Sequence, residues 1–159
     1  MLLAAIILQA STAAFAPPLD APRRVVTERR DGARTYRMER DIRFARVDKG
    51  YRAEVTLRAG IGETPDSSGA AYEAGFGAFA GSTIVFHLDP RGVVVAIDDM
   101  PALWERFCRR VAEVAAARHA LAPAEREKLA ARIAAPLRAL PVERRRAMLA
   151  SLVVAVIAD

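Results

Sequence analysis

The sequence predicts an α+β protein in which two antiparallel β-hairpins form a small sheet and a C-terminal segment of about three helices follows. Residues 35–58 and 83–98 alternate apolar and polar side chains, which is the period of half-buried strands, and a tight-turn sequence interrupts each range. From residue 99 onward, apolar side chains recur every three or four positions, as in an amphipathic helix. Strands followed by helices are typical of a two-layer α+β domain.

The chain of 159 residues is long enough for one domain with its own core. We divide it into a signal peptide, a mobile arm, the β-hairpins and the helical segment, at residues 1–16, 17–34, 35–98 and 99–159, the last two forming a single domain over 35–159. The arm is rich in proline and charge, and we expect only a short strand in it, near Val25 and Val26.

Residues 1–16 have the features of an export signal. The short apolar run Leu2–Leu8 is followed by small residues and an Ala-x-Ala sequence at Ala14–Ala16. The run is too short to cross a bilayer, for which roughly 20 apolar residues are needed. We therefore expect a periplasmic or secreted protein, cleaved after Ala14 or after Ala16. The alternative is an apolar N-terminal helix that stays attached.

The first hairpin reverses at Val47–Gly50. Setting Val47 opposite Gly50 places Phe44 opposite Ala53 on an apolar inner face. The same register places Arg43 opposite Glu54 on the outer face, and this agreement of both faces supports the register.

Two arginines, Arg40 and Arg46, fall on the apolar face of that hairpin. Arg46 is predicted to lie near Tyr51, where a cation can stand over the ring. Arg40 lies opposite Leu57, and there it has two interpretations: a side chain that reaches water at the strand edge, or an anion-binding residue in a pocket.

Residues 59–82 form a long glycine-rich connection between the hairpins. Tyr72, Phe76 and Phe79 are spaced as one face of a short helix. This segment is interpreted either as a helical turn that caps the sheet or as a movable aromatic flap that binds a ligand.

The second hairpin is predicted to reverse at Asp89–Gly92. If Asp89 lies opposite Gly92, Phe86 pairs with Val95 and Ile84 pairs with Ile97, so that the apolar residues share one face. This register places Asp98 opposite Thr83, away from His87 on the outer face.

A helix over residues 99–120 is expected next, with Asp98 or Asp99 as its N-cap and Pro101 in its first turn. We expect it to lie across one face of the sheet through the stripe Leu103, Trp104, Phe107, Cys108, Val111 and Val114. Two further helices are predicted to open at Pro123 and Pro141.

The last predicted helix begins with a basic triplet and ends in an apolar run. Arg144, Arg145 and Arg146 are interpreted as a solvated face or as a peripheral contact with an anionic surface. Ala147–Ala158 is too short to span a membrane, so it predicts a buried helix or a helix followed by a valine-rich strand. Its abrupt end also raises the hypothesis that the chain is C-terminally truncated.

The sequence offers few candidates for catalytic or metal-binding residues. Neither His87 nor His119 is spaced with other ligands as a metal site requires, and the only cysteine, Cys108, is predicted to be a core residue. The glycines form no phosphate-binding loop, and Ser67 lies in no nucleophile elbow. We expect no cofactor and no catalytic residues. The net charge of +5 is divided into opposed blocks, which does not favour nucleic acid as a partner.

Two sets of residues carry resemblances. Gly50–Leu57, Phe86–Asp89 and Asp98–Asp99 together resemble uncharacterised exported bacterial proteins, which implies an α+β envelope protein. Leu121–Arg126 and Leu140–Arg144 are similar to degenerate copies of the repeats of a helical periplasmic chaperone and metal-resistance family, although the Thr and Gln of those repeats are absent.

The functional hypothesis is a non-enzymatic envelope protein that binds a ligand or a partner. Candidate ligand-binding residues are Tyr72, Phe76, Phe79, Arg40 and His87. The alternatives are a hydrolase-like enzyme assembled around His87 and chaperone-like binding through the helices.

Overall fold

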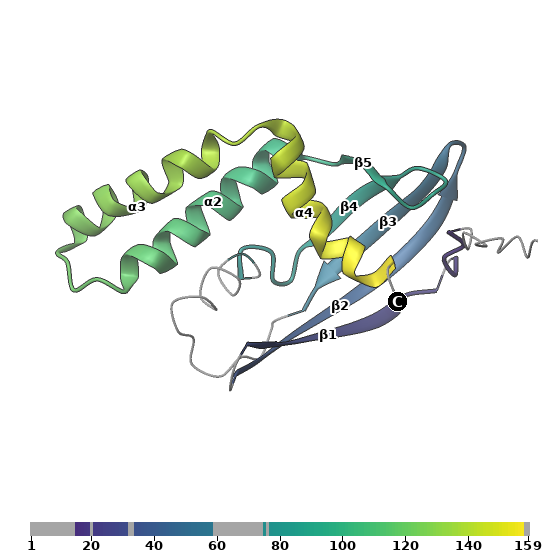
Figure 1. Ribbon diagram of the computed structural model, residues 1–159, viewed down its shortest axis with the longest axis horizontal. Helices are drawn as coiled ribbons and strands as arrows, with labels where there is room; N and C mark the ends of the chain where they lie inside the picture. The colour runs from purple at the N-terminus through teal and green to yellow at the C-terminus, as the bar shows by residue number, and fades with distance from the viewer. Residues whose placement is uncertain (1–14, 20, 32–33, 59–74, 76, 158–159) are drawn as a thin grey trace, which may run out of the picture.

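The computed structural model describes residues 15–19, 21–31, 34–58, 75 and 77–157. It confirms the α+β fold: an antiparallel sheet of five strands in the order β1-β2-β3-β4-β5 is followed by three helices (Figure 1). The elements are β1 (Arg23–Asp31), β2 (Arg34–Val47), β3 (Gly50–Leu57), β4 (Thr83–Leu88), β5 (Val94–Ile97), α2 (Met100–Ala117), α3 (Pro123–Arg138) and α4 (Val142–Ile157).

The sheet has one strand more than the two predicted hairpins supply. The strand expected near Val25 and Val26 is longer than predicted, because β1 pairs with β2 from Arg23, opposite Ile42, to Asp31, opposite Arg34. The segment assigned to an arm therefore contributes an edge strand to the sheet.

The β2–β3 hairpin has the predicted register. Val47 lies opposite Gly50 and Phe44 opposite Ala53, while Arg43 faces Glu54 on the other side. The apolar side chains of the inner face and the charged side chains of the outer face favour the same register. The two-residue turn allows this register to continue without a bulge.

The predicted register of the β4–β5 hairpin is wrong. Phe86 lies opposite Ile97, not Val95, and Leu88 lies opposite Val94, with a bulge between these pairs. As a result Val93 and Val95 are 53% and 49% exposed, whereas Val94 is buried. The strand has turned Val93 and Val95 to solvent.

The turn itself explains this change. The backbone N–H of Asp89 donates to the carbonyl of Val93 over 2.9 Å, so the loop is one residue longer than predicted. The Asp89 carboxylate accepts the N–H groups of Arg91 and Val93 at 2.8 and 2.9 Å, and Gly92 takes a φ of 83°. An aspartate that binds backbone groups two and four residues later, with a glycine at positive φ, fixes a longer turn.

The helix that crosses the sheet is α4, not the predicted 99–120 helix (Figure 1). Leu149 and Ala150 of α4 join the core of inner-face residues from the sheet. From α2, Leu103, Trp104 and Cys108 are buried in the same core. Farther along, Ala112 and Ala116 of α2 are buried, as is Ala134 of α3, and these two helices pack against each other. The small side chains thus turn α2 away from the sheet.

The junction between α3 and α4 is held by side chains that donate to carbonyl groups near the end of α3. The Trp104 indole Nε1 donates to the carbonyl of Leu137 at 3.1 Å. Arg145 donates to the carbonyls of Leu140 and Arg138 at 2.6 and 2.7 Å. The last carbonyls of a helix have no partner within it, and these donors satisfy them.

The apolar C-terminal segment continues as helix α4 to Ile157, as one interpretation expected, and no strand follows within the described residues. Leu149 and Ala150 of this helix are buried, whereas Met148 is 42% exposed. Residues 1–14, which carry most of the predicted signal peptide, lie outside the described residues.

Candidate functional site

The structure separates the predicted ligand-binding residues. Tyr72 and Phe76 lie outside the described residues. Arg40 is on the inner face of the sheet, Phe79 is in the core, and His87 is on the outer face. The structure therefore does not bring the three described residues into one site.

Arg40 does not reach water at the strand edge, because its side chain is fully buried. Its Nη2 donates to the hydroxyl of Thr27 on the neighbouring strand β1 at 2.5 Å, and it takes part in further contacts. Through this hydrogen bond Arg40 ties β1 to β2 from the inner side of the sheet.

Phe79 is a core residue with 1% exposure. Its ring stacks on Phe107 of α2 with centroids 6.3 Å apart. The guanidinium of Arg106 stands 5.3 Å from the centroid of the Phe79 ring. The end of the glycine-rich connection is thus anchored under α2.

His87 forms a pair with Asp98 that the sequence analysis missed. His87 Nε2 lies 2.8 Å from Asp98 Oδ1, and both side chains are partly exposed. The pair exists because the actual β4–β5 register shifts Asp98 away from Thr83, so that its backbone N–H bonds the carbonyl of Val85 at 3.0 Å. The combination of Asp89 and Gly92 favours the longer turn, which gives one residue of this shift, and the bulge between His87 and Leu88 gives the other.

A groove of about 560 Å³ begins beside this pair, where the start of β4 and the end of β5 meet the first half of α2. It is lined by Thr83, Ile84, Val85, Asp98, Asp99, Ala102, Leu103, Glu105, Arg106 and Arg109. Asp99 occupies the predicted N-cap position of α2, but its φ is 49° and its side chain makes no capping hydrogen bond. Asp99 therefore lines the groove, and its carboxylate does not cap the helix.

Two of the carboxylates in the groove are already paired. Asp98 bonds His87, and Glu105 accepts two hydrogen bonds from Arg138 of α3, one of them at 2.8 Å. The Arg138 guanidinium holds the pKa of Glu105 below its usual range, although partial burial opposes this shift.

Two arginines, Arg106 and Arg109, line the same groove. Arg106 Nη1 lies 3.4 Å from the hydroxyl of Ser82, a long contact. Its Nε is buried and has no hydrogen-bond partner in the described part of the chain. A buried donor without a partner costs free energy unless a ligand or water binds it.

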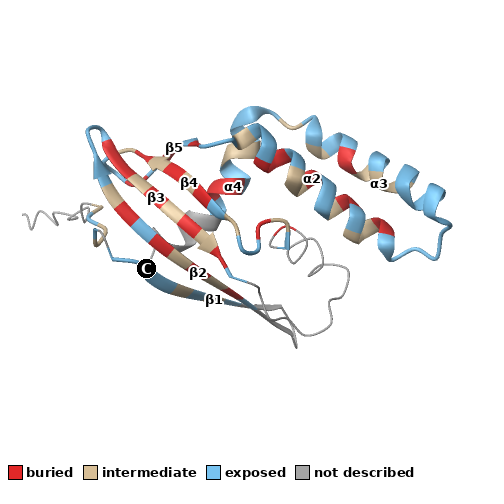
Figure 2. Cartoon of the chain, turned by 180° about the vertical axis from the view of Figure 1, so that it is seen from behind, coloured by how far each residue is buried: buried red, intermediate tan, exposed pale blue. Residues whose placement is uncertain are grey.

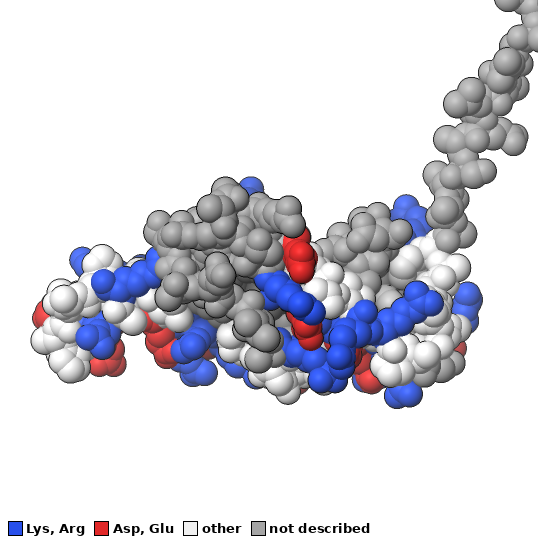
Figure 3. All heavy atoms as spheres, turned by 90° about the horizontal axis from the view of Figure 1, so that it is seen from below, with Lys and Arg blue, Asp and Glu red and all other residues white. Residues whose placement is uncertain are grey.

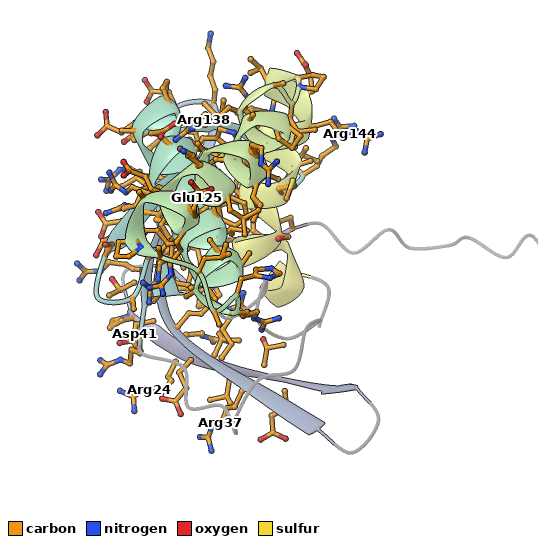
Figure 4. The ribbon with its side chains drawn as sticks, turned by 90° about the vertical axis from the view of Figure 1, so that its left-hand side faces the viewer. Arg24, Arg37, Asp41, Glu125, Arg138 and Arg144 are labelled. Atoms are coloured by element: carbon orange, nitrogen blue, oxygen red, sulfur yellow. The ribbon has the colours of Figure 1, made fainter. Side chains whose placement is uncertain are left out.

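The charges on the outer face of the sheet are arranged in neighbouring pairs. Asp41 binds both Arg24 and Arg58, Arg37 binds Glu39, and Arg52 binds Glu54. Figure 3 shows acidic side chains between the basic ones on the side seen from below, and Figure 4 shows Arg24 and Asp41 close together. These pairs do not form the uninterrupted basic surface typical of a nucleic-acid interface.

The basic triplet of α4 is divided between structural and exposed roles. Arg145 binds carbonyls at the end of α3, and Arg146 Nη1 donates to the carbonyl of Val95 in β5 at 3.0 Å. Arg144 is exposed and points away from the body of the protein (Figure 4). Only one side chain of the triplet thus projects freely from this surface.

Cys108 is fully buried in the core, as predicted, and burial raises the pKa of its thiol. No three His, Cys, Asp or Glu side chains among the described residues are grouped so that they could hold a metal ion. None of the helices searched, within the described ranges, is both long and apolar enough to cross a membrane.

Comparisons with protein-family models, curated proteins and solved structures find no match to this chain.

Proposed function

We propose that this chain is a non-enzymatic binding protein of the cell envelope that holds an anionic group of its ligand in the groove between β4, β5 and α2. The observation that carries the proposal is the buried Arg106 Nε, which has no partner in the described part of the chain. The envelope location rests on the signal-like pattern of residues 1–16.

The charge distribution of the groove supports an anionic ligand. Arg138 neutralises Glu105, and Asp98 is hydrogen-bonded to His87. Within the described residues, Asp99 is therefore the carboxylate of the groove that has no side-chain partner, and Arg106 and Arg109 line the same groove. A guanidinium binds carboxylate and phosphate groups through two parallel hydrogen bonds.

The apolar lining supports a ligand with a hydrophobic part beside the anion. Ile84, Val85 and Leu103 are among the residues that line the groove, and the Arg106 guanidinium rests over the ring of Phe79. Sites for small molecules combine an apolar surface with a few polar groups that fix orientation. A monocarboxylate with an apolar tail satisfies both features.

The test is a titration of the chain with inorganic phosphate and with a series of monocarboxylates of increasing tail length. Trp104, the sole tryptophan, lies on α2 between two groove residues and serves as the fluorescent reporter. We expect binding to strengthen with tail length and to weaken about tenfold or more in Arg106→Gln. Arg132→Gln, an exposed arginine on α3, is the matched control. Equal affinity of Arg106→Gln and the unmodified chain would reject the proposal.

A second candidate function, hydrolysis assisted by His87, is favoured by the His87–Asp98 hydrogen bond, since a carboxylate orients a catalytic imidazole in many hydrolases. However, no hydroxyl or thiol among the described residues bonds to His87, and Cys108 is buried in the core. If the chain hydrolyses a panel of activated esters and His87→Ala abolishes that activity, this second function replaces the first.

A further inference from the structure

Strand β1 forms one edge of the sheet. Its only neighbour in the strand order is β2, and its exposed residues lie along the margin of the sheet in Figure 2. An edge strand presents backbone N–H and carbonyl groups that can pair with another strand. Val26, in the middle of β1, is 43% exposed although it is apolar.

The backbone groups of Val26 point away from the sheet. The carbonyl of Glu39 in β2 accepts the N–H of Arg58 at 3.0 Å, so the backbone groups of Glu39 face β3. Val26 lies opposite Glu39. In an antiparallel ladder Val26 must then belong to a pair without mutual hydrogen bonds, and its N–H and carbonyl face outward. By the same alternation, so do those of Arg24 and Glu28.

The side chains of these three residues lie together on the outer face of the sheet. They alternate with Val25 and Thr27, and Thr27 contacts the inward-facing Arg40. Glu28 is exposed and makes no hydrogen bond or ion pair within the described residues. Arg24 is 57% exposed and touches Asp41 through its Nε only, at 3.3 Å, so its terminal nitrogens remain available.

We infer that β1 pairs with β1 of a second copy of this chain, antiparallel and centred on Val26, so that the two sheets join into one. In this register Val26 meets Val26, and the outward-facing backbone groups of both strands form a ladder. Arg24 of each copy faces Glu28 of the other. The Glu28 carboxylate, which has no partner within the described residues, can then pair with the Arg24 guanidinium of the other copy. The two-fold axis produces this ion pair twice.

The charges nearest the centre favour this register over the others that pair most of the strand. Centring on Thr27 sets the two arginines at positions 24 and 30 opposite each other, and centring on Glu28 sets that carboxylate opposite itself. The Val26 register also sets two arginines, at positions 23 and 29, opposite each other three positions from its centre. What distinguishes it is the oppositely charged pair Arg24 and Glu28, two positions from the centre. The opposite charges beside the centre thus favour the Val26 register.

This interface is distinct from the proposed ligand groove. The groove is built from β4, β5 and α2, whereas β1 is the opposite edge of the sheet. Pairing through β1 leaves both grooves of the dimer accessible, so the two proposals succeed or fail independently.

The first test exchanges the charges. Light scattering after size-exclusion chromatography should show a dimer of the unmodified chain that dissociates on dilution. Glu28→Arg and Arg24→Glu should each be monomeric, because each sets like charges opposite each other, and an equimolar mixture of the two should recover dimers. A monomeric unmodified chain, single variants that remain dimeric, or a mixture that stays monomeric would each overturn the inference.

The second test fixes the register without relying on charge. In a hydrogen-bonded antiparallel pair the two Cα atoms lie about 5.5 Å apart, within the range of a disulfide. Val26→Cys should therefore form a disulfide-linked dimer under mild oxidation, while Glu28→Cys, on the same face, should not. The buried Cys108 does not compete. Equal or greater cross-linking of Glu28→Cys would contradict the Val26-centred pairing.

Discussion

The β2–β3 and β4–β5 hairpins of the same sheet differ in how strictly their sequences define them. In β2–β3 a two-residue turn is followed by continuous pairing from Val47 and Gly50 onward. In β4–β5 the turn is longer and a bulge follows, so that Phe86 meets Ile97. Both hairpins present an apolar inner face to the core.

The difference shows that alternation determines which face of a strand is buried but does not by itself determine the register of a short strand. β5 has only four residues, and the hydrogen bonds of the Asp89 carboxylate to the turn outweigh the burial of Val93 and Val95. The irregular hairpin is also the one that brings His87 to Asp98 beside the groove. Bulges commonly re-aim side chains near functional sites.

The largest predicted effect breaks the regular hairpin. Gly50 has a φ of 145°, and a Cβ at this position would lie 2.0 Å from the carbonyl oxygen of Leu88 in β4. Gly50→Ala must therefore strain its own backbone and displace β4, and we expect a loss of roughly 3 kcal/mol or more of unfolding free energy. Urea unfolding followed by Trp104 fluorescence measures this loss. Lys49→Ala, an exposed change in the same turn, is the control, and similar midpoints for both variants would contradict the argument.

The second prediction sharpens the comparison by testing the register of β5. Val94 is buried and Val95 is 49% exposed. Val94→Ala should cost about 1.5 kcal/mol for the two methyl groups removed from the core, and Val95→Ala less than about 0.5 kcal/mol. The alternation of the sequence alone predicts the reverse order. The same urea titration separates the two registers, because each places a different valine in the core.

The fold class and the β2–β3 hairpin could be predicted from the sequence because several local signals agreed. The apolar pair Phe44 and Ala53 on the inner face and the charged pair Arg43 and Glu54 on the outer face both indicated the same register. The positions of the helices were also readable from their periodicity, and α3 begins at Pro123 as expected.

The arrangement of the helices could not be predicted, because it depends on contacts between distant segments. The alanines at positions 112, 116 and 134 give no strong hydrophobic signal in the sequence. In the structure they allow α2 and α3 to pack closely, and α4 is the helix that crosses the sheet. The same limit applies to the groove, since Thr83 and Val85 of β4 meet Arg106 of α2 only once the helix is packed against the sheet. Arg40 was recognised as unusual, but its burial depends on the side chains around it.

The smallest predicted effect tests the turn that sets the register of β4–β5. The N–H of Val93 donates to the Asp89 carboxylate and, with that of Arg91 and the Arg91 side chain, holds the pKa of Asp89 below its usual range, although burial opposes this. A carboxyl group with a pKa depressed by folding stabilises the protein above its unfolded pKa of about 4 and loses that contribution as the pH falls through the folded value.

Asp89→Asn should therefore be less stable than the unmodified chain at neutral pH, and the gap should narrow as the pH falls below about 4. Thermal unfolding from neutral pH to about pH 2 measures the gap. Asp48→Asn, in the β2–β3 turn, removes a carboxylate without such hydrogen bonds among the described residues and controls for net charge. Because the Asp89 bonds close the turn that displaces Val95, a gap that stays constant down to acid pH would mean that the carboxylate charge does not hold this hairpin in its bulged register.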